Sequence, residues 1–168
     1  LRATYFWDTQ PEFNTDDIPL IPSPSLKLND SLKVYSDNTL DRNFLAIDSW
    51  HPNLFILVDG IPYKVEKSML DHCPNLKKTM TRFKDGTVVT YAIGNGQLKV
   101  LQTRESLEEC KLTFDRLNKI GLDIQEVFKK YANDLLKPSL LDTYKAYKEA
   151  TELFTGLPSV DFNERVRI

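Results

Sequence analysis

The stretch NLFILVDGIPYKVEKSMLDHCPNLKKTMTRF, residues 53–83, decides the fold. It opens with the most concentrated apolar run in the chain, residues 54–58, which is typical of a fully buried strand. Asp59 and Gly60 then predict a tight turn, because glycine accepts a positive φ without a steric penalty. The next few residues would form the return strand. Pro62 is tolerated there only at the start of a strand or on a sheet edge.

Two short helices are predicted in the second half of this stretch. Ser68 is a candidate N-cap with Asp71 three residues later, and Pro74 would end the first helix. Asn75 could then cap a second helix. Its apolar face has spacings of four and three residues: Leu76, Met80 and Phe83. Basic side chains fill the other side: Lys77, Lys78, Arg82 and Lys84.

Residues 87–93 are β-branched and aromatic, which predicts a further strand of the same sheet. Beyond them, apolar residues at helical spacing predict three helices, with Gly121 as a break between the first two: 105–119, 123–136 and 139–155. We therefore predict an α+β fold. A small, mostly antiparallel sheet would pack on helices, with a helical C-terminal half and an extended N-terminal arm.

Composition divides the chain into an acidic, proline-containing and aromatic arm, an α+β core, a helical segment packed on that core, and a tail: 1–53, 54–104, 105–157 and 158–168. The arm has 8 acidic and 4 basic residues, whereas the remainder has 16 and 18. Its large rings are unusual for a solvated tail: Tyr5, Phe6, Trp7, Phe13, Phe44 and Trp50. They either pack on this chain's own body or dock on a partner. The alternation within 26–35 also predicts a strand at a sheet edge.

Overall composition narrows the class of protein. A chain of 168 residues with 41 % hydrophobic content can bury a core without metals or disulfides. A net charge of −2 argues against a protein dominated by nucleic-acid contacts. No run approaches the ~18 apolar residues of a membrane span, so no membrane partner is expected.

The two cysteines predict the cellular compartment of the protein, and the first residue predicts whether the chain is part of a longer one. Two cysteines are too few for a disulfide framework and favour reduced thiols in an intracellular protein, in either cytoplasm or nucleus. The chain begins at Leu1 without an initiator Met or a signal-peptide pattern. This start predicts a segment taken from a longer protein.

The sequence contains little that is typical of catalysis. His72 adjoins Cys73, but neighbouring residues on a helix point apart and make a poor metal pair. The turn at Gly94-Asn95-Gly96 lacks the further glycine and the lysine of phosphate-binding loops. We predict no catalytic residue, no cofactor and no metal site. A site assembled in space from distant residues stays open.

The basic group at Lys77, Lys78, Arg82 and Lys84 has three interpretations. It could bind an acidic segment or phosphates of a partner, or be the solvated side of an amphipathic helix. It could also pair with this chain's own acidic arm around Asp16-Asp17. The leading hypothesis is a non-enzymatic protein–protein interaction or oligomerisation module, an adaptor or scaffold. It would bind a protein partner, itself included, through the basic group and the rings of the arm: Tyr5, Phe6, Trp7 and Phe13.

One family resemblance supports that hypothesis. Residues 58–70, VDGIPYKVEKSML, with Pro74 beyond them, resemble the opening of BTB/POZ domains of the potassium-channel tetramerisation type. That pattern has a strand, a glycine turn, an aromatic three residues later, Ser/Thr-x-Leu entering a helix, and a proline. The resemblance covers about residues 54–101 and departs from the family at Pro62 and after residue 105. It implies a fold that self-associates or adapts other proteins to partners, including cullin ligases.

The alternative hypothesis is a nucleic-acid-binding module with an RNA-recognition-motif-like fold that uses the basic helix face. Residues 54–61 would be its first strand, with helices over 68–83 and 105–118. The aromatic residues that stack on RNA in such folds are missing from the central strands, where Leu57 and the run 97–100 stand instead. A protein partner is therefore expected ahead of a nucleic acid.

Overall fold

The computed structural model describes residues 24–36, 47–94, 96–98, 100–101, 106–135 and 140–155. Its elements in chain order are β1 (Leu26–Lys27), β2 (Leu32–Tyr35), β3 (Asn53–Val58), β4 (Ile61–Lys64), α1 (Lys67–Leu70), α2 (Pro74–Met80), β5 (Val88–Ile93), α3 (Lys111–Asp134) and α4 (Leu140–Thr151). The arm residues predicted to bind a partner lie outside the described residues, as does the tail: Tyr5, Phe6, Trp7, Phe13 and 158–168.

The strands form one sheet in the order β1-β2-β5-β3-β4. The middle strand β5 pairs antiparallel with β2 and parallel with β3, while β1–β2 and β3–β4 are antiparallel neighbours. The predicted α+β class with a mostly antiparallel sheet is therefore confirmed. The alternating segment 26–35 enters the sheet as predicted. It supplies two strands instead of one, so the described sheet begins within the segment predicted as an arm.

The β3–β4 hairpin follows the sequence prediction closely. Asp59 and Gly60 form its turn with φ of 51° and 82°. Pro62 lies on the edge strand β4, opposite Leu57. Because the Val65 amide donates to the Leu54 carbonyl, alternation along the ladder turns the backbone of Pro62 away from β3. The missing N–H of proline therefore removes no bond of the sheet.

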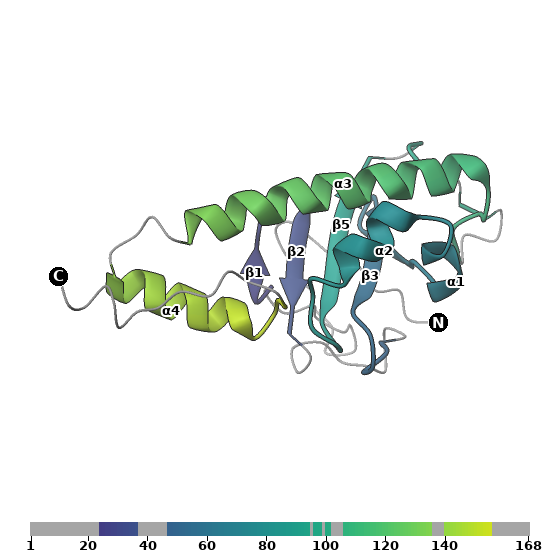
Figure 1. Cartoon of the computed structure of the whole chain (residues 1–168). Helices are drawn as coiled ribbons and strands as arrows, with labels where there is room; N and C mark the ends of the chain where they lie inside the picture. The colour runs from purple at the N-terminus through teal and green to yellow at the C-terminus, as the bar shows by residue number, and fades with distance from the viewer. Residues whose placement is uncertain are drawn as a thin grey trace, which may run out of the picture.

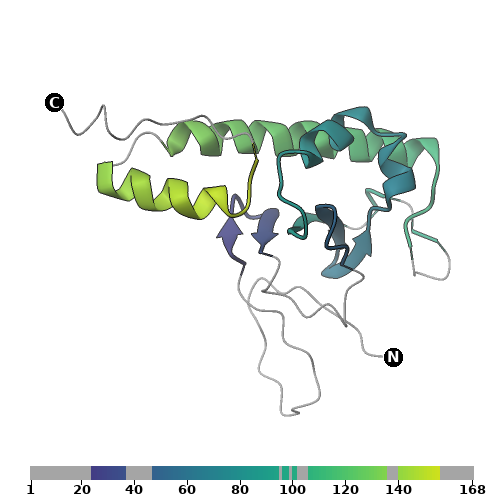
Figure 2. The ribbon, with the colours of Figure 1, turned by 60° about the horizontal axis from the view of Figure 1, so that its bottom comes forward.

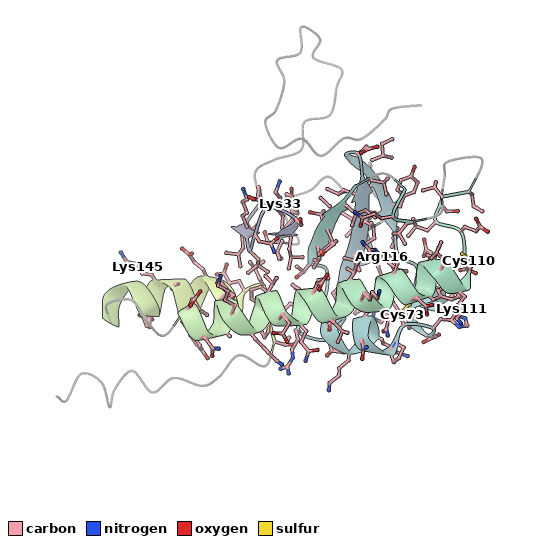
Figure 3. All side chains as sticks on the ribbon, turned by 90° about the horizontal axis from the view of Figure 1, so that it is seen from above. Lys33, Cys73, Cys110, Lys111, Arg116 and Lys145 are labelled. Carbon is pink, nitrogen blue, oxygen red and sulfur yellow. The ribbon has the colours of Figure 1, made fainter. Side chains whose placement is uncertain are left out.

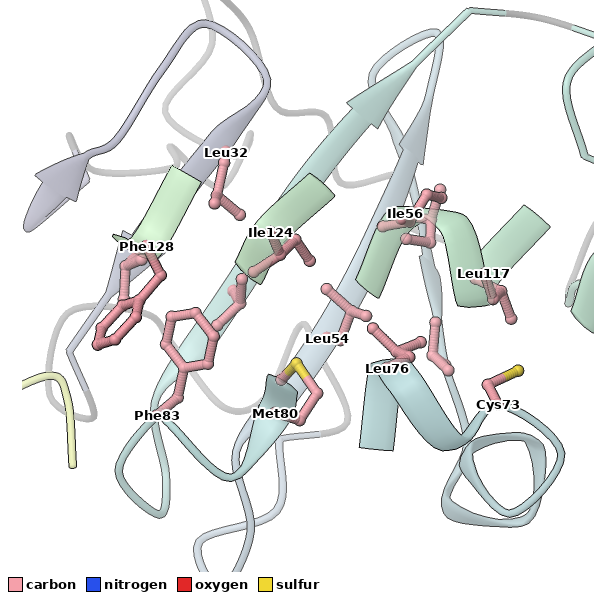
Figure 4. Close-up of a cluster of buried hydrophobic side chains, with 14 of the residues drawn as sticks. Leu32, Leu54, Ile56, Cys73, Leu76, Met80, Phe83, Leu117, Ile124 and Phe128 are labelled. Carbon is pink, nitrogen blue, oxygen red and sulfur yellow. The ribbon is translucent and has the colours of Figure 1, made fainter. Parts of the chain in front are cut away.

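The helices cover one face of this sheet. Figures 1 and 2 show α3 crossing over the strands, with α2 beside it and α4 running alongside its C-terminal half. Apolar side chains from the sheet and from α2 and α3 point toward one another between the layers (Figure 4), among them Leu32, Leu54, Ile56, Leu76, Met80, Leu117, Ile124 and Phe128. This layer is the hydrophobic core.

The predicted helix break at Gly121 is wrong, because α3 runs through it without interruption. At this point α3 passes directly against α2. A Cβ atom placed on Gly121 would lie 2.6 Å from the backbone nitrogen and Cα of Leu76. The glycine permits close helix packing here, and its carbonyl accepts a 3.0 Å hydrogen bond from the Thr79 hydroxyl of α2.

The predicted N-caps also differ from the structure. Glu66 precedes α1 without a side-chain cap, and Ser68 lies inside that helix. Pro74 begins α2 instead of ending α1, since the first helical residue needs no N–H. The Asn75 amide donates to Asn118 Oδ1 of α3 at 2.9 Å. A residue 43 positions away thus caps α2, which a local capping pattern cannot predict.

Two further helix starts lie elsewhere than predicted. The first predicted C-terminal helix spans 105–119, but α3 begins at Lys111, directly after Cys110. The second predicted helix begins at residue 123, which lies inside α3, because α3 is one helix where the pattern suggested two.

Thr90 in the middle of β5 has an unusual environment. Its side chain is fully buried, and among the described residues its hydroxyl has no hydrogen-bond partner. On the same face, Phe55, Val88 and Tyr35 form a second apolar cluster, against which Ile47 packs. A buried hydroxyl without a partner keeps its desolvation cost without compensation.

Replacing Thr90 by Val should therefore raise the free energy of unfolding by about 1 kcal/mol, because valine has nearly the same shape and no polar group. Urea denaturation measures the change. The matched control is Thr79→Val, because the Thr79 hydroxyl shares its one proton between Asn75 O at 2.8 Å and Gly121 O at 3.0 Å. That variant should be destabilised. Equal effects of the two substitutions would contradict the prediction.

Candidate interaction surface

The loop that leads into β3 is held by one buried amide. Asn53 is 2 % exposed, and its Oδ1 accepts the Asp48 N–H at 2.8 Å. Its Nδ2 donates to the carbonyls of Asp48 at 2.8 Å and His51 at 3.1 Å, with a longer contact to Thr87 O at 3.4 Å. The Asp48 carboxylate in turn accepts the Trp50 N–H at 2.8 Å. The backbone from 48 to 53 is thereby fixed in one conformation.

This fixed loop exposes a tryptophan. Trp50 is 80 % exposed, the highest value among the large hydrophobic side chains in the described residues. Tryptophan is highly buried on average in folded proteins, and it is enriched among the residues that dominate binding energies at interfaces. A rigid backbone also lowers the entropy lost when such a side chain is immobilised by a partner.

A groove of about 710 Å³ adjoins this loop. It lies between the loop, the end of β4, α1, α2 and the segment that follows α2. Its apolar lining includes the half-buried Pro52 and Leu70, together with three side chains that belong to the buried core: Val65, Met80 and Phe83. Four lysines line it as well: Lys64, Lys67, Lys77 and Lys84. His51, which follows Trp50 in the chain, is part of its wall. Its size falls in the range of ligand-binding clefts.

The groove also contains negative charge. Asp48, Glu66 and Asp85 line it, so the charges of the lining nearly balance. Just outside, Asp71 pairs with Lys77 at 2.7 Å. The hydrogen bond from Lys77 and its positive charge lower the pKa of the Asp71 carboxyl. The Asp48 carboxylate is already engaged with the Trp50 amide.

The structure divides the predicted basic group. Lys77 and Lys84 line the groove, whereas Lys78 is exposed on α2 outside the lining. The Arg82 guanidinium lies 5.9 Å from the ring centre of Phe128, which belongs to α3. The four residues therefore do not make one continuous basic face, and two of them contribute to the groove.

The chain after α4 positions the Lys84 side of the groove. Phe154 forms an antiparallel bridge with Phe83. The Lys84 amide donates to the Leu153 carbonyl at 2.9 Å, and the Thr155 amide donates to the Arg82 carbonyl at 2.7 Å. Residues 153–155 thus hold the segment 82–84 as a neighbouring strand would.

Sequence reasoning missed Trp50, Lys64 and Lys67 as residues of this surface. Trp50 was counted among rings that could pack on the body or on a partner, and the structure turns it outward. A local signal was present in the run Asp48-Ser49-Trp50-His51-Pro52-Asn53, because Asp and Asn side chains bond the backbone of such turns. The two lysines come together with Lys77 and Lys84 only through the tertiary fold.

Asn53→Ala should unfold with a free energy about 2 kcal/mol lower than that of the parent chain, because the change removes several hydrogen bonds in a buried site. It should also speed hydrogen exchange at the Asp48 and Trp50 amides. Urea denaturation and exchange mass spectrometry measure the two effects. Trp50→Ala is the control and should leave stability within about 0.5 kcal/mol. Unchanged exchange in Asn53→Ala would contradict the assigned role.

A second hollow, of about 470 Å³, lies between the end of β5 and α3. Four of its polar side chains are engaged with one another. The Tyr91 hydroxyl donates to Asp123 at 3.3 Å, and Arg116 bonds Gln97. These four side chains are therefore less available to a ligand.

The histidine and cysteine side chains considered as nucleophiles or metal ligands are engaged in packing or in local hydrogen bonds. His72 stacks on the Phe114 ring with centres 4.5 Å apart. Cys73 is buried, and burial raises the pKa of its thiol. Cys110, labelled near the start of α3 in Figure 3, is partly exposed. The Thr113 hydroxyl, by hydrogen bonding, lowers the pKa of the Cys110 thiol.

Within 24–36, 47–94, 96–98, 100–101, 106–135 and 140–155, no three His, Cys, Asp or Glu side chains gather as metal ligands would. None of the helices in those ranges combines the length and apolar character needed to cross a bilayer.

Comparison with known proteins gave no relatives. No protein-family model, no curated protein and no solved structure matches the chain.

Proposed function

We propose that this chain is a non-enzymatic protein–protein interaction module whose contact surface is Trp50 and the groove beside it. One observation carries the proposal. Trp50 is 80 % exposed on a loop that Asn53 holds by hydrogen bonds, and other residues of this loop, Asp48 and His51 to Asn53, line a groove. Tryptophan is one of the residues that most often contribute a large share of the binding energy at protein interfaces, so an exposed tryptophan on such a loop is a candidate hot spot.

A nucleic-acid partner has less support. The basic side chains are divided between the groove and α3, and three carboxylates line the groove, where they would repel phosphates. Binding of single strands also uses several aromatic side chains in series, and Trp50 stands alone on this loop. In addition, the segment 54–61, taken as one strand of an RNA-recognition-motif-like fold, turns back at Asp59-Gly60.

The resemblance of residues 58–70 to BTB/POZ domains makes self-association one form of the proposed function. The chain's own second copy would then be the partner of Trp50. Light scattering across a concentration series distinguishes this case. A dimer or larger species that dissociates in Trp50→Ala supports self-association through this surface. A monomer at all concentrations assigns the surface to a different protein.

The proposed function is tested by placing a photo-crosslinking amino acid at position 50 of the full chain. We expect a discrete adduct in cell extract. Its partner is then identified by mass spectrometry, purified, and shown to bind the parent chain and to lose at least tenfold in affinity for Trp50→Ala. The same crosslinker at Lys145, on α4 (Figure 3), is the control and should yield no such adduct.

The proposal fails if position 50 yields no adduct, or if the purified partner binds the parent chain and Trp50→Ala equally. Trp50→Ala suits this comparison because the exposed ring supports little of the fold. A matching thermal unfolding curve would confirm that the variant is intact.

A further inference from the structure

We infer that the second face of the sheet, which is turned away from the helices, is a docking surface for this chain's own N-terminal segment, residues 1–23. The strands present five buried side chains to this face: Tyr35, Phe55, Leu57, Val88 and Thr90. This face is separate from the groove beside Trp50, so its occupant is independent of the proposed function.

The second face is buried although the described helices lie on the other side of the sheet. Figures 1 and 2 show α2 and α3 packed on one face. In an antiparallel sheet with one face in water, polar side chains alternate with apolar ones along each strand. β3 does not alternate in this way, because all six of its residues are buried. Both faces of the sheet are therefore covered.

The described residues supply only part of the second cover. Ile47 packs against the cluster that contains Tyr35 and Val88, where β5 begins. Leu57 lies at the other end of β3, four residues and about 13 Å beyond the level of Val88. Even so, Leu57 is 6 % exposed and Thr90 is 0 % exposed. One isoleucine cannot reach across this distance, so other parts of the chain must cover the face.

Residues 1–23 join the sheet beside this face and are long enough to cross it. The chain enters β1 after Ser25, whose hydroxyl accepts the Ser36 N–H at 3.0 Å next to the end of β2. Extended chain spans about 3.3 Å per residue, so the segment reaches on the order of 70 Å. The five strands lie about 4.8 Å apart, which makes the sheet about 20 Å wide.

The composition of the segment fits a mainly apolar face. It carries seven large apolar side chains: Tyr5, Phe6, Trp7, Phe13, Ile18, Leu20 and Ile21. Aromatic rings bury more area than other side chains, so they gain most from such a surface. We therefore assign the rings of the segment to packing on the chain's own body.

The charges of the segment and of the sheet are complementary. The side chains of residues 1–23 have a net charge of −3, from four acidic residues and Arg2. No residue of the five described strands is acidic. Lys33 and Lys64 lie half-buried on the second face, on β2 and β4, to either side of the apolar patch.

Residues 37–46 are the other candidate for this cover, and they fit it less well. They connect β2 to Ile47, and both ends lie where β3 and β5 begin. A connection tied at both ends near one edge has less freedom to reach Leu57. It also contains one aromatic residue, Phe44, whereas the N-terminal segment contains four.

The two tryptophans of the chain make the docking measurable. Fluorescence reports on Trp7 alone in a Trp50→Phe chain, and on Trp50 alone in the matched Trp7→Phe chain. Acrylamide should quench Trp7 at least threefold less efficiently than Trp50, which is 80 % exposed. Unfolding in urea should remove the difference. Equal quenching of the two tryptophans in the folded chains would overturn the inference.

A photo-crosslinking amino acid at position 33 of the full chain tests which face the segment contacts. We expect a link within one chain, and mass spectrometry of the digested adduct should assign it to residues 1–23. The same crosslinker at Lys145 on α4 is the control and should give no link to that segment (Figure 3).

Three results would each overturn the inference. A link from position 33 to residues 37–46 alone would assign the face to that connection. A link between two chains would assign it to a second copy. A protected Trp7 without any link to residues 1–23 would place the ring elsewhere. The affinity of a partner for Trp50→Ala is measured separately, so the proposed function can fail or hold whichever result is found.

Discussion

Gly121→Ala is expected to lower the free energy of unfolding by about 3 kcal/mol, which is the upper end of the usual cost of overpacking. The added methyl group would lie 2.6 Å from two backbone atoms of Leu76 and 3.0 Å from the Asn75 carbonyl carbon. Backbone cannot rotate aside as a flexible side chain can. The two helices must therefore separate, which also stretches the hydrogen bond from Thr79 to Gly121.

A second effect of this substitution has the opposite sign and is smaller. Alanine is favoured over glycine inside a helix by about 1 kcal/mol, so α3 alone would gain stability. A net loss therefore shows that the contact with α2 dominates. Gly94→Ala is the matched control, since a Cβ there meets only the Gln97 amide nitrogen at 3.4 Å. Urea denaturation of both variants measures the difference, and a stabilised Gly121→Ala would refute the close approach.

Phe154→Ala is expected to lower the free energy of unfolding by about 4 kcal/mol, as is usual when a buried phenylalanine is removed. The ring is 2 % exposed and packs against three aromatic rings, those of Phe83, Phe128 and Tyr131, with centres 5.1–5.6 Å away. It joins the end of α4 to α3 and to the segment after α2. Its loss leaves a cavity where these parts meet.

The same substitution should reach the groove. Phe154 keeps residues 82–84 in place through its bridge with Phe83, so Lys84 should become mobile. We expect faster hydrogen exchange at the Lys84 and Thr155 amides together with the loss of stability. Tyr144→Ala, on α4 before Phe154, is the control, because that ring is half exposed. If Tyr144→Ala were equally destabilising, α4 as a whole and not the Phe154 anchor would be responsible.

The parts of the fold that could be predicted are those that neighbouring residues determine. The run 54–58 is apolar at every position, and Asp59-Gly60 can take the positive φ values of a two-residue turn, so the β3–β4 hairpin follows from local chemistry. The strand at β5 follows in the same way from its β-branched residues.

The helix ends could not be predicted, because distant residues determine them. Asn118 caps α2 from another helix, so Asn75 and Pro74 have places that a capping pattern does not indicate. Glycine often ends a helix, but Gly121 lies inside α3 and allows close packing against α2. Only the approach of Leu76, 45 positions away in the chain, distinguishes the two.

The candidate surface was predicted in part for a similar reason. Helical spacing correctly put Lys77 on the outer side of α2, and it lines the groove together with Lys84. Spacing could not show that Arg82 would extend toward Phe128, or that Lys64 and Lys67 would join from β4 and α1. Trp50 is exposed on a loop that Asn53 holds by hydrogen bonds. Asn53 bonds nearby backbone groups and also contacts the carbonyl of Thr87, the residue before β5, which is distant in the chain.

The position of β2 in the sheet has a consequence for biosynthesis. β2 leaves the ribosome before its lasting partner β5, which follows only after β3, β4, α1 and α2 have been made. Until then β2 has only the two-residue strand β1 beside it, and an isolated hairpin is marginally stable in water. Leu32 and Val34 therefore stay exposed on the nascent chain until β5 has been made. The folding rate of the protein should be set by the late joining of β2 to β5, a contact between distant parts of the sequence.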